Sequence, residues 1–229
     1  MNFWVVGMVK ISVVIPACNE EKTVGDVVKG CFDVLKSFGC EFEVIVVDDG
    51  STDKTFKVAK KAGAKVFRHK KSLGQAVALK TGFKHCFGDI VVTMDADGQH
   101  NPKLLKPILN GEADMVIGSR YLTGKSGFGF YREILDKIFI SLIRILTGLK
   151  LTDTQSMFRA IKRQALLKLN IKTSYTMSTE MVIKAWGEGL TIKEVPIEAL
   201  SRRYGKSHMG ILFPIKTLLI IFRSIIEVR

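Results

Sequence analysis

Short apolar runs alternate with amphipathic segments of helical spacing through the first half of this 229-residue chain. An apolar run of roughly four to eight residues is typical of a strand buried on both faces, and apolar residues three and four apart are typical of a helix. The predicted strands are 11–15, 42–47, 65–68, 89–94 and 115–118, and the predicted helices are about 20–38, 52–62, 73–87 and 101–110. This alternation predicts an α/β fold, with a mostly parallel sheet covered by helices on both faces.

The second half of the chain is less regular. Two unusually apolar helices are predicted over 131–149 and 209–229, and shorter elements over 163–169, 178–188 and 190–196, the last of them a strand. No internal repeat, low-complexity tract or flexible linker is visible. One compact domain with peripheral helices is therefore expected.

Composition narrows the class of protein. With 47% hydrophobic and 25% charged residues the chain can bury a core, which excludes a disordered or collagen-like protein. Four cysteines without a C-x-x-C pair indicate neither a disulfide framework nor a zinc site, and they fit a reducing compartment. The longest apolar tract, 217–222, is far below the ~20 residues of a spanning helix, so no transmembrane span is predicted.

The net charge of +13 is concentrated in the second half. Residues 1–119 hold 16 Lys and Arg against 14 Asp and Glu, whereas residues 120–229 hold 19 against 8. Such an excess indicates a phosphate-rich partner: a nucleic acid, an anionic membrane surface or a phosphorylated substrate.

Acidic residues follow two of the predicted strands directly. Asp48 and Asp49 come after 42–47, and Asp95 and Asp97 come after 89–94. Ligands of parallel sheets collect beyond the carboxyl ends of the strands, and Mg²⁺ and Mn²⁺ prefer carboxylate and carbonyl oxygens. The alternative is that these side chains only cap helices and close turns.

Several short motifs follow one another along residues 10–210. They are Pro16-Ala-Cys-Asn19-Glu20-Glu21, Asp48-Asp-Gly-Ser-Thr-Asp53, Gly74-Gln-Ala, Asp95-Ala-Asp-Gly-Gln-His100, Gly118-Ser-Arg120, Asp153-Thr-Gln-Ser156-Met-Phe-Arg159 and Arg202-Arg-Tyr-Gly-Lys-Ser207. In this order they resemble the inverting family 2 glycosyltransferases of GT-A fold. The last two narrow the resemblance to the branch of dolichyl-phosphate mannose synthases and polyprenyl-phosphate glycosyltransferases.

The resemblance implies a GT-A catalytic domain over residues 1–210, with roles for individual residues. The implied nucleotide-sugar site comprises Pro16, Asn19, Glu20, Asp48, Asp49, Asp95 and Ala96. Asp97 and Gln99 would bind a divalent metal, Mn²⁺ or Mg²⁺, and Asp97 is also expected to be catalytic. A metal there would neutralise the diphosphate leaving group, which is the main electrostatic demand of the reaction.

The implied acceptor is a polyprenyl or dolichyl phosphate, whose anionic oxygen needs little help from a general base. The candidate partners of its phosphate are Arg120, Arg132, Ser156 and Arg202, the last also counted as catalytic. Arg132 is chosen only for its position ahead of an apolar helix. The chain departs from the family at Met157, where glycine is usual, and at His208, where lysine is usual.

A membrane-bound acceptor requires a surface that meets the membrane. Helix 131–149 carries Lys137 and Arg144 on one face, and the C-terminal helix 211–229 carries Lys216 and Arg223, each amid aliphatic residues. Apolar helices with a cationic stripe are typical of the membrane interface. We therefore expect a peripheral protein on the cytoplasmic face of the cell membrane; a core or dimer-interface role for these helices is the alternative.

The donor and acceptor stay open at this stage. Inverting transfer of mannose from GDP-mannose is favoured, with UDP-glucose or a UDP-N-acetylhexosamine as alternatives, because Asp49 can accept hydrogen bonds from guanine or uracil. A glycan hydroxyl acceptor would need a general base, for which Glu180 is the first candidate. A nucleotidyltransferase would lack its usual glycine-rich phosphate loop. A nucleic-acid-binding domain would lack a series of stacking aromatic residues, so no nucleic-acid partner is expected.

Overall fold

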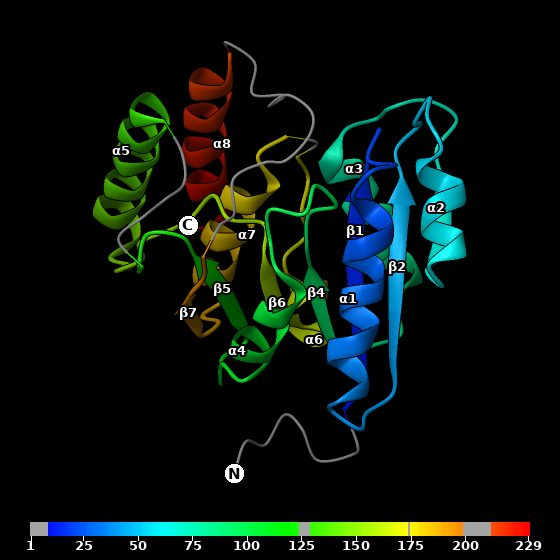
Figure 1. Cartoon of the computed structure of the whole chain (residues 1–229). Helices are drawn as coiled ribbons and strands as arrows, with labels where there is room; N and C mark the ends of the chain where they lie inside the picture. The colour runs from blue at the N-terminus through cyan, green and yellow to red at the C-terminus, as the bar shows by residue number, and fades with distance from the viewer. Residues whose placement is uncertain (1–8, 124–128, 174, 199–211) are drawn as a thin grey trace.

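The computed structural model describes residues 9–123, 129–173, 175–198 and 212–229, and its centre is a seven-stranded sheet (Figure 1). The strands lie in the order β3-β2-β1-β4-β6-β5-β7. Their bounds are Ile11–Ala17 (β1), Phe42–Asp48 (β2), Lys65–Arg68 (β3), Ile90–Thr93 (β4), Met115–Ser119 (β5), Arg159–Lys162 (β6) and Ile192–Pro196 (β7). All pairings are parallel except those of β6 with β4 and with β5. The predicted mostly parallel sheet is confirmed.

Strand β6 is the one element of the sheet that the sequence did not indicate. It consists of Arg-Ala-Ile-Lys, a short stretch with a charged residue at each end and no apolar run. It is nevertheless central, because it lies between β4 and β5. Its first residue, Arg159, is completely buried. Strand β1 also differs slightly from the prediction, since it continues through Pro16 to Ala17.

Helices cover both faces of the sheet. One face carries α1 (Val24–Lys36), α2 (Thr55–Lys61) and α4 (Leu105–Leu109), the last after a short 3₁₀ turn at Pro102–Leu104. The other face carries α3 (Gln75–His85), α6 (Arg163–Lys168) and α7 (Met177–Gly187). The two-residue period of a strand produces this division: Val13 and Ile15 of β1 contact the first layer, and Val14 contacts the second.

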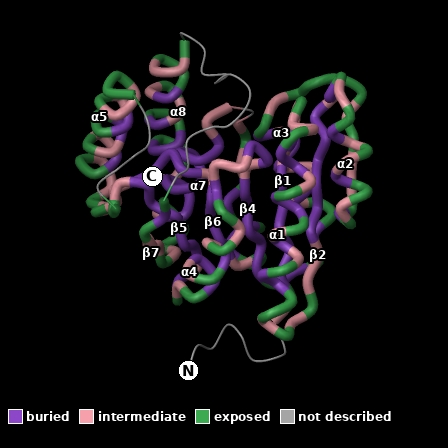
Figure 2. The backbone as a smooth tube through the Cα atoms, viewed as in Figure 1, coloured by how far each residue is buried: buried purple, intermediate pink, exposed green. Residues whose placement is uncertain are grey.

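Two further helices, α5 (Phe130–Thr147) and α8 (Phe213–Val228), lie side by side at the left of Figure 1. They form a separate apolar cluster with α7, built on Phe139, Ile143, Ile183, Ile221 and Ile225. Figure 2 shows that their outer sides are exposed. Within the described part of the chain no helix is both long and apolar enough to cross a membrane.

Candidate active site

The loops after β1 and β2 are tied together by hydrogen bonds in both directions. Asn19 donates its backbone N–H to Ser51 Oγ (2.9 Å) and accepts through Oδ1 from the N–H of Thr52 (2.8 Å). Glu20 donates its backbone N–H to Thr55 Oγ1 (2.8 Å). The φ of Asn19 is 57°, a left-handed conformation that asparagine tolerates better than most residues. The two loops, residues 18–23 and 49–54, are thus joined at the carboxyl edge of the sheet, and together they are called the ledge.

Asp48, which ends β2, is fully buried and engaged within its own loop. Its Oδ1 accepts from the backbone N–H of Ser51 (2.9 Å), and its Oδ2 lies 3.1 Å from Nε of Arg68. Arg68 in turn donates to the Ser51 carbonyl (2.8 Å). These contacts close the turn after β2, and nucleotide binding by Asp48 stays a prediction.

Asp49 organises the loop that leads into α3. Its two oxygens accept from His69 Nδ1 (2.7 Å), Ser72 Oγ (2.7 Å) and the backbone N–H groups of Leu73 and Gly74. Burial opposes ionisation, yet the bonds from Leu73 and His69 hold the pKa of Asp49 below its usual value. The carboxylate is therefore ionised and fixes residues 69–74 around it.

The loop after β4 carries the second acidic cluster. Asp95 accepts a hydrogen bond from Nε2 of Gln75 (2.7 Å), the first residue of α3. The residue before it, Gly74, donates its backbone N–H to Asp49. Asp97 is buried, with 5% of its surface exposed, and its Oδ1 accepts from the backbone N–H of Gln99 (3.0 Å). The acidic loops of β2 and β4 are thus joined through the start of α3.

The donor set of this loop fits the predicted metal. Asp97 offers a carboxylate and Gln99 an amide oxygen, both hard ligands of Mg²⁺ and Mn²⁺. Among the described residues no three His, Cys, Asp or Glu side chains are grouped to hold a metal ion. Magnesium in particular is often held by one or two protein carboxylates together with substrate phosphates, and that arrangement suits Asp97.

His100 connects the acidic loop to the segment directly before β6. Its ring is stacked on that of Phe158, with centroids 5.1 Å apart and planes 18° apart. Its Nδ1 lies 3.9 Å from Oδ2 of Asp95. Burial lowers the pKa of His100, so the ring is neutral at physiological pH.

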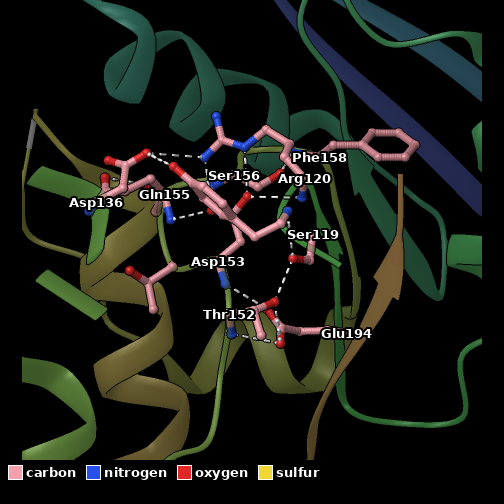
Figure 3. Close-up of polar contacts among 12 residues, drawn as sticks. Ser119, Arg120, Asp136, Thr152, Asp153, Gln155, Ser156, Phe158 and Glu194 are labelled. Carbon is pink, nitrogen blue, oxygen red and sulfur yellow. Dashed lines mark hydrogen bonds and ion pairs between the residues drawn. The ribbon is translucent and has the colours of Figure 1, made fainter. Parts of the chain in front are cut away.

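Arg120, directly after β5, and Asp153 form a buried, bidentate ion pair (Figure 3). Nε of Arg120 donates to Oδ2 of Asp153 (2.6 Å), and Nη2 donates to Oδ1 (2.8 Å). Asp153 also accepts from the backbone N–H groups of Gln155 and Ser156. Although burial opposes ionisation, Arg120 holds the pKa of Asp153 below its usual value. Arg120 and Ser156, two predicted phosphate partners, therefore meet at one carboxylate.

Two charged residues that the sequence reasoning missed support this loop. Glu194 of β7 accepts from the N–H groups of Thr152 (2.8 Å) and Asp153 (2.7 Å). Arg159 donates to the carbonyls of Thr154, Ser156 and Ser178, and burial lowers its pKa to about 10. Arg159 belongs to a motif quoted above, but no pattern in the sequence indicates that an arginine is buried inside a sheet.

Arg132 lies at the start of α5, beside an acidic residue that the sequence reasoning also missed. Asp136 is fully buried and accepts from the Tyr121 hydroxyl (2.7 Å); Arg132 Nε lies 3.7 Å from its carboxylate. The signal in the sequence was a single aspartate in an apolar helix, four residues after an arginine. Arg202, the motif 202–207 and His208 lie outside the described residues.

Glu180 makes its own set of contacts, although its neighbour Thr179 accepts a hydrogen bond from Gln155 (2.8 Å). Its carboxylate accepts from the backbone N–H groups of Lys172 and Thr173 (2.9 Å each) and pairs with Lys184 at 3.1 Å. It is buried, with 3% of its surface exposed. These contacts engage both oxygens in holding the segment that precedes α7.

A doubly covered, mostly parallel sheet with acidic loops at its carboxyl edge is compatible with the predicted GT-A fold, and the comparisons with known proteins identify the family. Residues 12–169 match the model of the family described as Glycosyl transferase family 2. The protein is a glycosyltransferase and belongs to this family.

Archaeal relatives extend the similarity. An uncharacterised protein of Methanocaldococcus jannaschii is 38% identical over 86% of this chain and 84% of its own length. The dolichol-phosphate mannosyltransferase of Pyrococcus furiosus is 32% identical over 87% of this chain, which spans 59% of that relative. The UDP-N-acetylglucosamine–dolichyl-phosphate N-acetylglucosaminyltransferase of Methanococcus voltae is 34% identical over 85% of this chain and 87% of its own length.

Solved structures support the same fold. The glucosyl-3-phosphoglycerate synthase of Mycobacterium tuberculosis, in complex with Mn²⁺, UDP-glucose and phosphoglyceric acid, superposes with a TM-score of 0.77 at 25% identity. The match covers 95% of this chain and 80% of that one. The predicted GT-A fold is confirmed.

Proposed function

We propose that this chain transfers a hexose, with inversion, from a nucleotide sugar to a polyprenyl or dolichyl phosphate, assisted by Mn²⁺ or Mg²⁺. The observation that carries the proposal is the contact between the acidic loop after β4 and the loop before β6, which holds Asp153, the partner of Arg120. His100 follows Asp97 and Gln99 and stacks on Phe158, two residues after Ser156. A metal-bound diphosphate and an acceptor phosphate would therefore be neighbours.

The donor side is assigned to the ledge and the acidic loop. The residues that would line the nucleotide sugar are Pro16, Asn19, Glu20, Asp48, Asp49, Asp95 and Ala96. Asp48 and Asp49 would also shape the loops around it, through their hydrogen bonds to Ser51 and to residues 69–74. Asp97 and Gln99 would hold the metal, which supplies electrostatic stabilisation of the leaving diphosphate when bound. The named complex of the M. tuberculosis synthase with Mn²⁺ and UDP-glucose supports this use of the fold.

The acceptor side is assigned to Arg120, Arg132, Ser156 and Arg202. Guanidinium groups match phosphate oxygens with paired hydrogen bonds, which favours arginine at such a site. Three of the relatives are named for transfer to dolichyl or undecaprenyl phosphate, and the class of acceptor is common to all three names. Their sugars differ, so the relatives support the acceptor more strongly than the sugar.

The membrane contact is assigned to α5 and α8, with residues 1–210 as the catalytic domain and 211–229 as the surface helix. Both helices, and Leu212 directly before α8, present exposed apolar residues: Phe130, Tyr131, Ile134, Ile138, Ile145, Leu212, Ile215, Leu219, Phe222 and Ile226. Lys137, Arg144, Lys216 and Arg223 are exposed beside them, as anionic headgroups would require. We place the protein on the cytoplasmic face of the membrane.

A glycan hydroxyl acceptor is the second candidate, and the surroundings of Glu180 argue against it. A general base needs a carboxylate within hydrogen-bond reach of the attacking hydroxyl. The Glu180 carboxylate is instead held by Lys172, Thr173 and Lys184. A phosphate acceptor needs no such base, since it is already anionic.

A transfer assay tests the proposal. Purified protein with Mn²⁺ is given GDP-mannose, UDP-glucose or UDP-N-acetylglucosamine, each with a polyprenyl phosphate in detergent, and labelled sugar is measured in the organic phase. We expect label in the lipid from one donor, GDP-mannose being favoured, and none when the phosphate is replaced by the free polyprenol. Transfer to a soluble glycan with no transfer to lipid would refute the acceptor assignment.

A further inference from the structure

A line of alternating charges runs from the sheet to α5. Asp153 pairs with Arg120, whose Nη2 lies 4.0 Å from Oδ2 of Asp136, and the same oxygen lies 3.7 Å from Nε of Arg132. Figure 3 shows the Asp136 carboxylate and the Arg120 guanidinium facing one another. Asp136 therefore stands between two arginines that come from different elements.

The environment of Asp136 is unusual for a helix at the edge of the molecule. The side chain is 1% exposed, although α5 is exposed along its outer side. Oδ2 accepts from the Tyr121 hydroxyl, whereas Oδ1 has no hydrogen-bond partner among the described residues. An incompletely bonded buried carboxylate destabilises a fold, so its presence calls for a compensating role.

Three members of the line of charges are buried, and only the member at its far end is substantially exposed. The side chains of Asp153, Arg120 and Asp136 are 0%, 7% and 1% exposed, and that of Arg132 is 23% exposed. The Arg132 guanidinium also lies over the ring of Phe213, 5.6 Å from its centroid, at the start of α8. Arg132 is thus the member that a ligand can reach, at the junction of the two outer helices.

We propose that Asp136 is a positioning residue: its buried carboxylate, held by Tyr121, orients Arg132 and Arg120 toward the acceptor phosphate and links α5 to the site. This deepens the proposed function and rests on it. A guanidinium on a flexible stem loses rotamer entropy when it binds, and a fixed counter-ion reduces that loss by holding it in place beforehand. The same carboxylate makes the position of the site depend on the docking of α5.

The test uses Asp136→Asn, which keeps the size of the side chain and removes its charge. Burial raises the pKa of Asp136, which reduces the cost of the neutral substitute. Affinity for farnesyl phosphate in detergent and for GDP or UDP with Mn²⁺ is measured by calorimetry on the full chain. We expect farnesyl phosphate binding to weaken roughly 10- to 100-fold, as for the side chains that orient metal ligands, with nucleotide binding unchanged.

Two further variants make the result specific. Tyr121→Phe removes the hydroxyl that holds Asp136 and should weaken farnesyl phosphate binding in the same direction, and it decides the question if Asp136→Asn does not fold. Glu227→Gln is the matched control: it removes a carboxylate that ties α8 to Lys172 and Lys184, away from the two arginines. We expect it to leave both affinities unchanged.

Four outcomes would overturn the inference. They are unchanged or tighter farnesyl phosphate binding by Asp136→Asn, an equal loss in nucleotide binding, an equal loss in Glu227→Gln, or a wild type that binds nucleotide but no farnesyl phosphate. Only the last also removes the proposed acceptor, so failure of the two proposals can be told apart.

Discussion

Carboxylates at the carboxyl edge of the sheet have different roles because their surroundings differ. Asp49 is surrounded by donors from its own chain, which favour its charged form and use it to shape a loop. Asp97 accepts from the backbone N–H of Gln99, two residues along, within a loop whose amide and carboxylate oxygens suit a hard cation. The spacing of these aspartates along the chain does not distinguish Asp49 from Asp97, whereas the contacts of their carboxylate oxygens do.

Asp97→Ala should remove metal-dependent activity. Losing a metal ligand removes charge stabilisation of the leaving diphosphate, and we expect kcat to fall at least about 10²- to 10³-fold. Electron paramagnetic resonance titration of Mn²⁺ with nucleotide present should show the loss of binding directly. Asp26→Ala, an exposed acid in the first turn of α1, is the control. Full activity of the wild type in excess chelator would contradict the prediction.

Asp114 should contribute to acid stability. The ammonium of Lys162 and the N–H and hydroxyl of Thr191 lower its pKa from 3.8 to about 2. A carboxyl whose pKa is lower in the folded state stabilises the fold above its unfolded pKa, and that contribution is lost as pH falls through about 4 to 2. In urea denaturation over this range, Asp114→Asn should show a smaller decrease in unfolding free energy than the wild type. Equal decreases would refute the assignment.

At the scale of elements, α5 and α8 each have one side packed against the protein and one side exposed. On α8 the exposed residues Ile215, Leu219, Phe222 and Ile226 recur every three or four positions, which places them in one stripe. The opposite side is anchored by the cluster with α7. An exposed apolar stripe on an anchored helix is suited to a flat apolar partner. Lys216 and Arg223, exposed on the same helix, favour an anionic membrane as that partner.

Substitutions of exposed apolar residues in the α8 stripe and on α5 should weaken binding to vesicles without unfolding the protein. Leu219→Glu and Ile145→Glu should each reduce partition onto phosphatidylglycerol vesicles by roughly tenfold or more, because a transferred Leu or Ile side chain contributes about 1.5–3 kcal/mol. Leu167→Glu is matched in exposure, at 74%, but lies on α6. We expect no change in its partition. Sedimentation with vesicles measures all three, and equal loss in the control would refute a specific membrane surface.

At the scale of the whole molecule, the sheet brings the groups that we propose for donor and acceptor binding from distant parts of the chain to one edge. The proposed donor groups lie in the loops after β1, β2 and β4, and the proposed acceptor groups lie after β5, before β6 and at the start of α5. Strand β6 makes this possible, since it reverses direction and places residues 153–156 beside the end of β5.

The nucleotide should bind with strong base selectivity. A base recognised by buried hydrogen bonds is discriminated by orders of magnitude, because the wrong base leaves polar groups unpaired. With Mn²⁺ present we expect calorimetry to detect GDP at least about tenfold more tightly than UDP. Tight UDP binding with no GDP signal would overturn the mannose assignment, while the fold and the family membership would stand.

The sequence by itself determined the parallel strands, their helices and the acidic loops at their ends. These features depend on local periodicity and on residues next to one another, such as Asp95 and Asp97. Only the tertiary structure decided that Arg159 is a buried strand residue, that Asp136 stands between Arg120 and Arg132, and that Glu180 holds a loop. Buried ion pairs join groups that are far apart in the chain. The free energy of burying and pairing each charge depends on surroundings that only the whole fold creates.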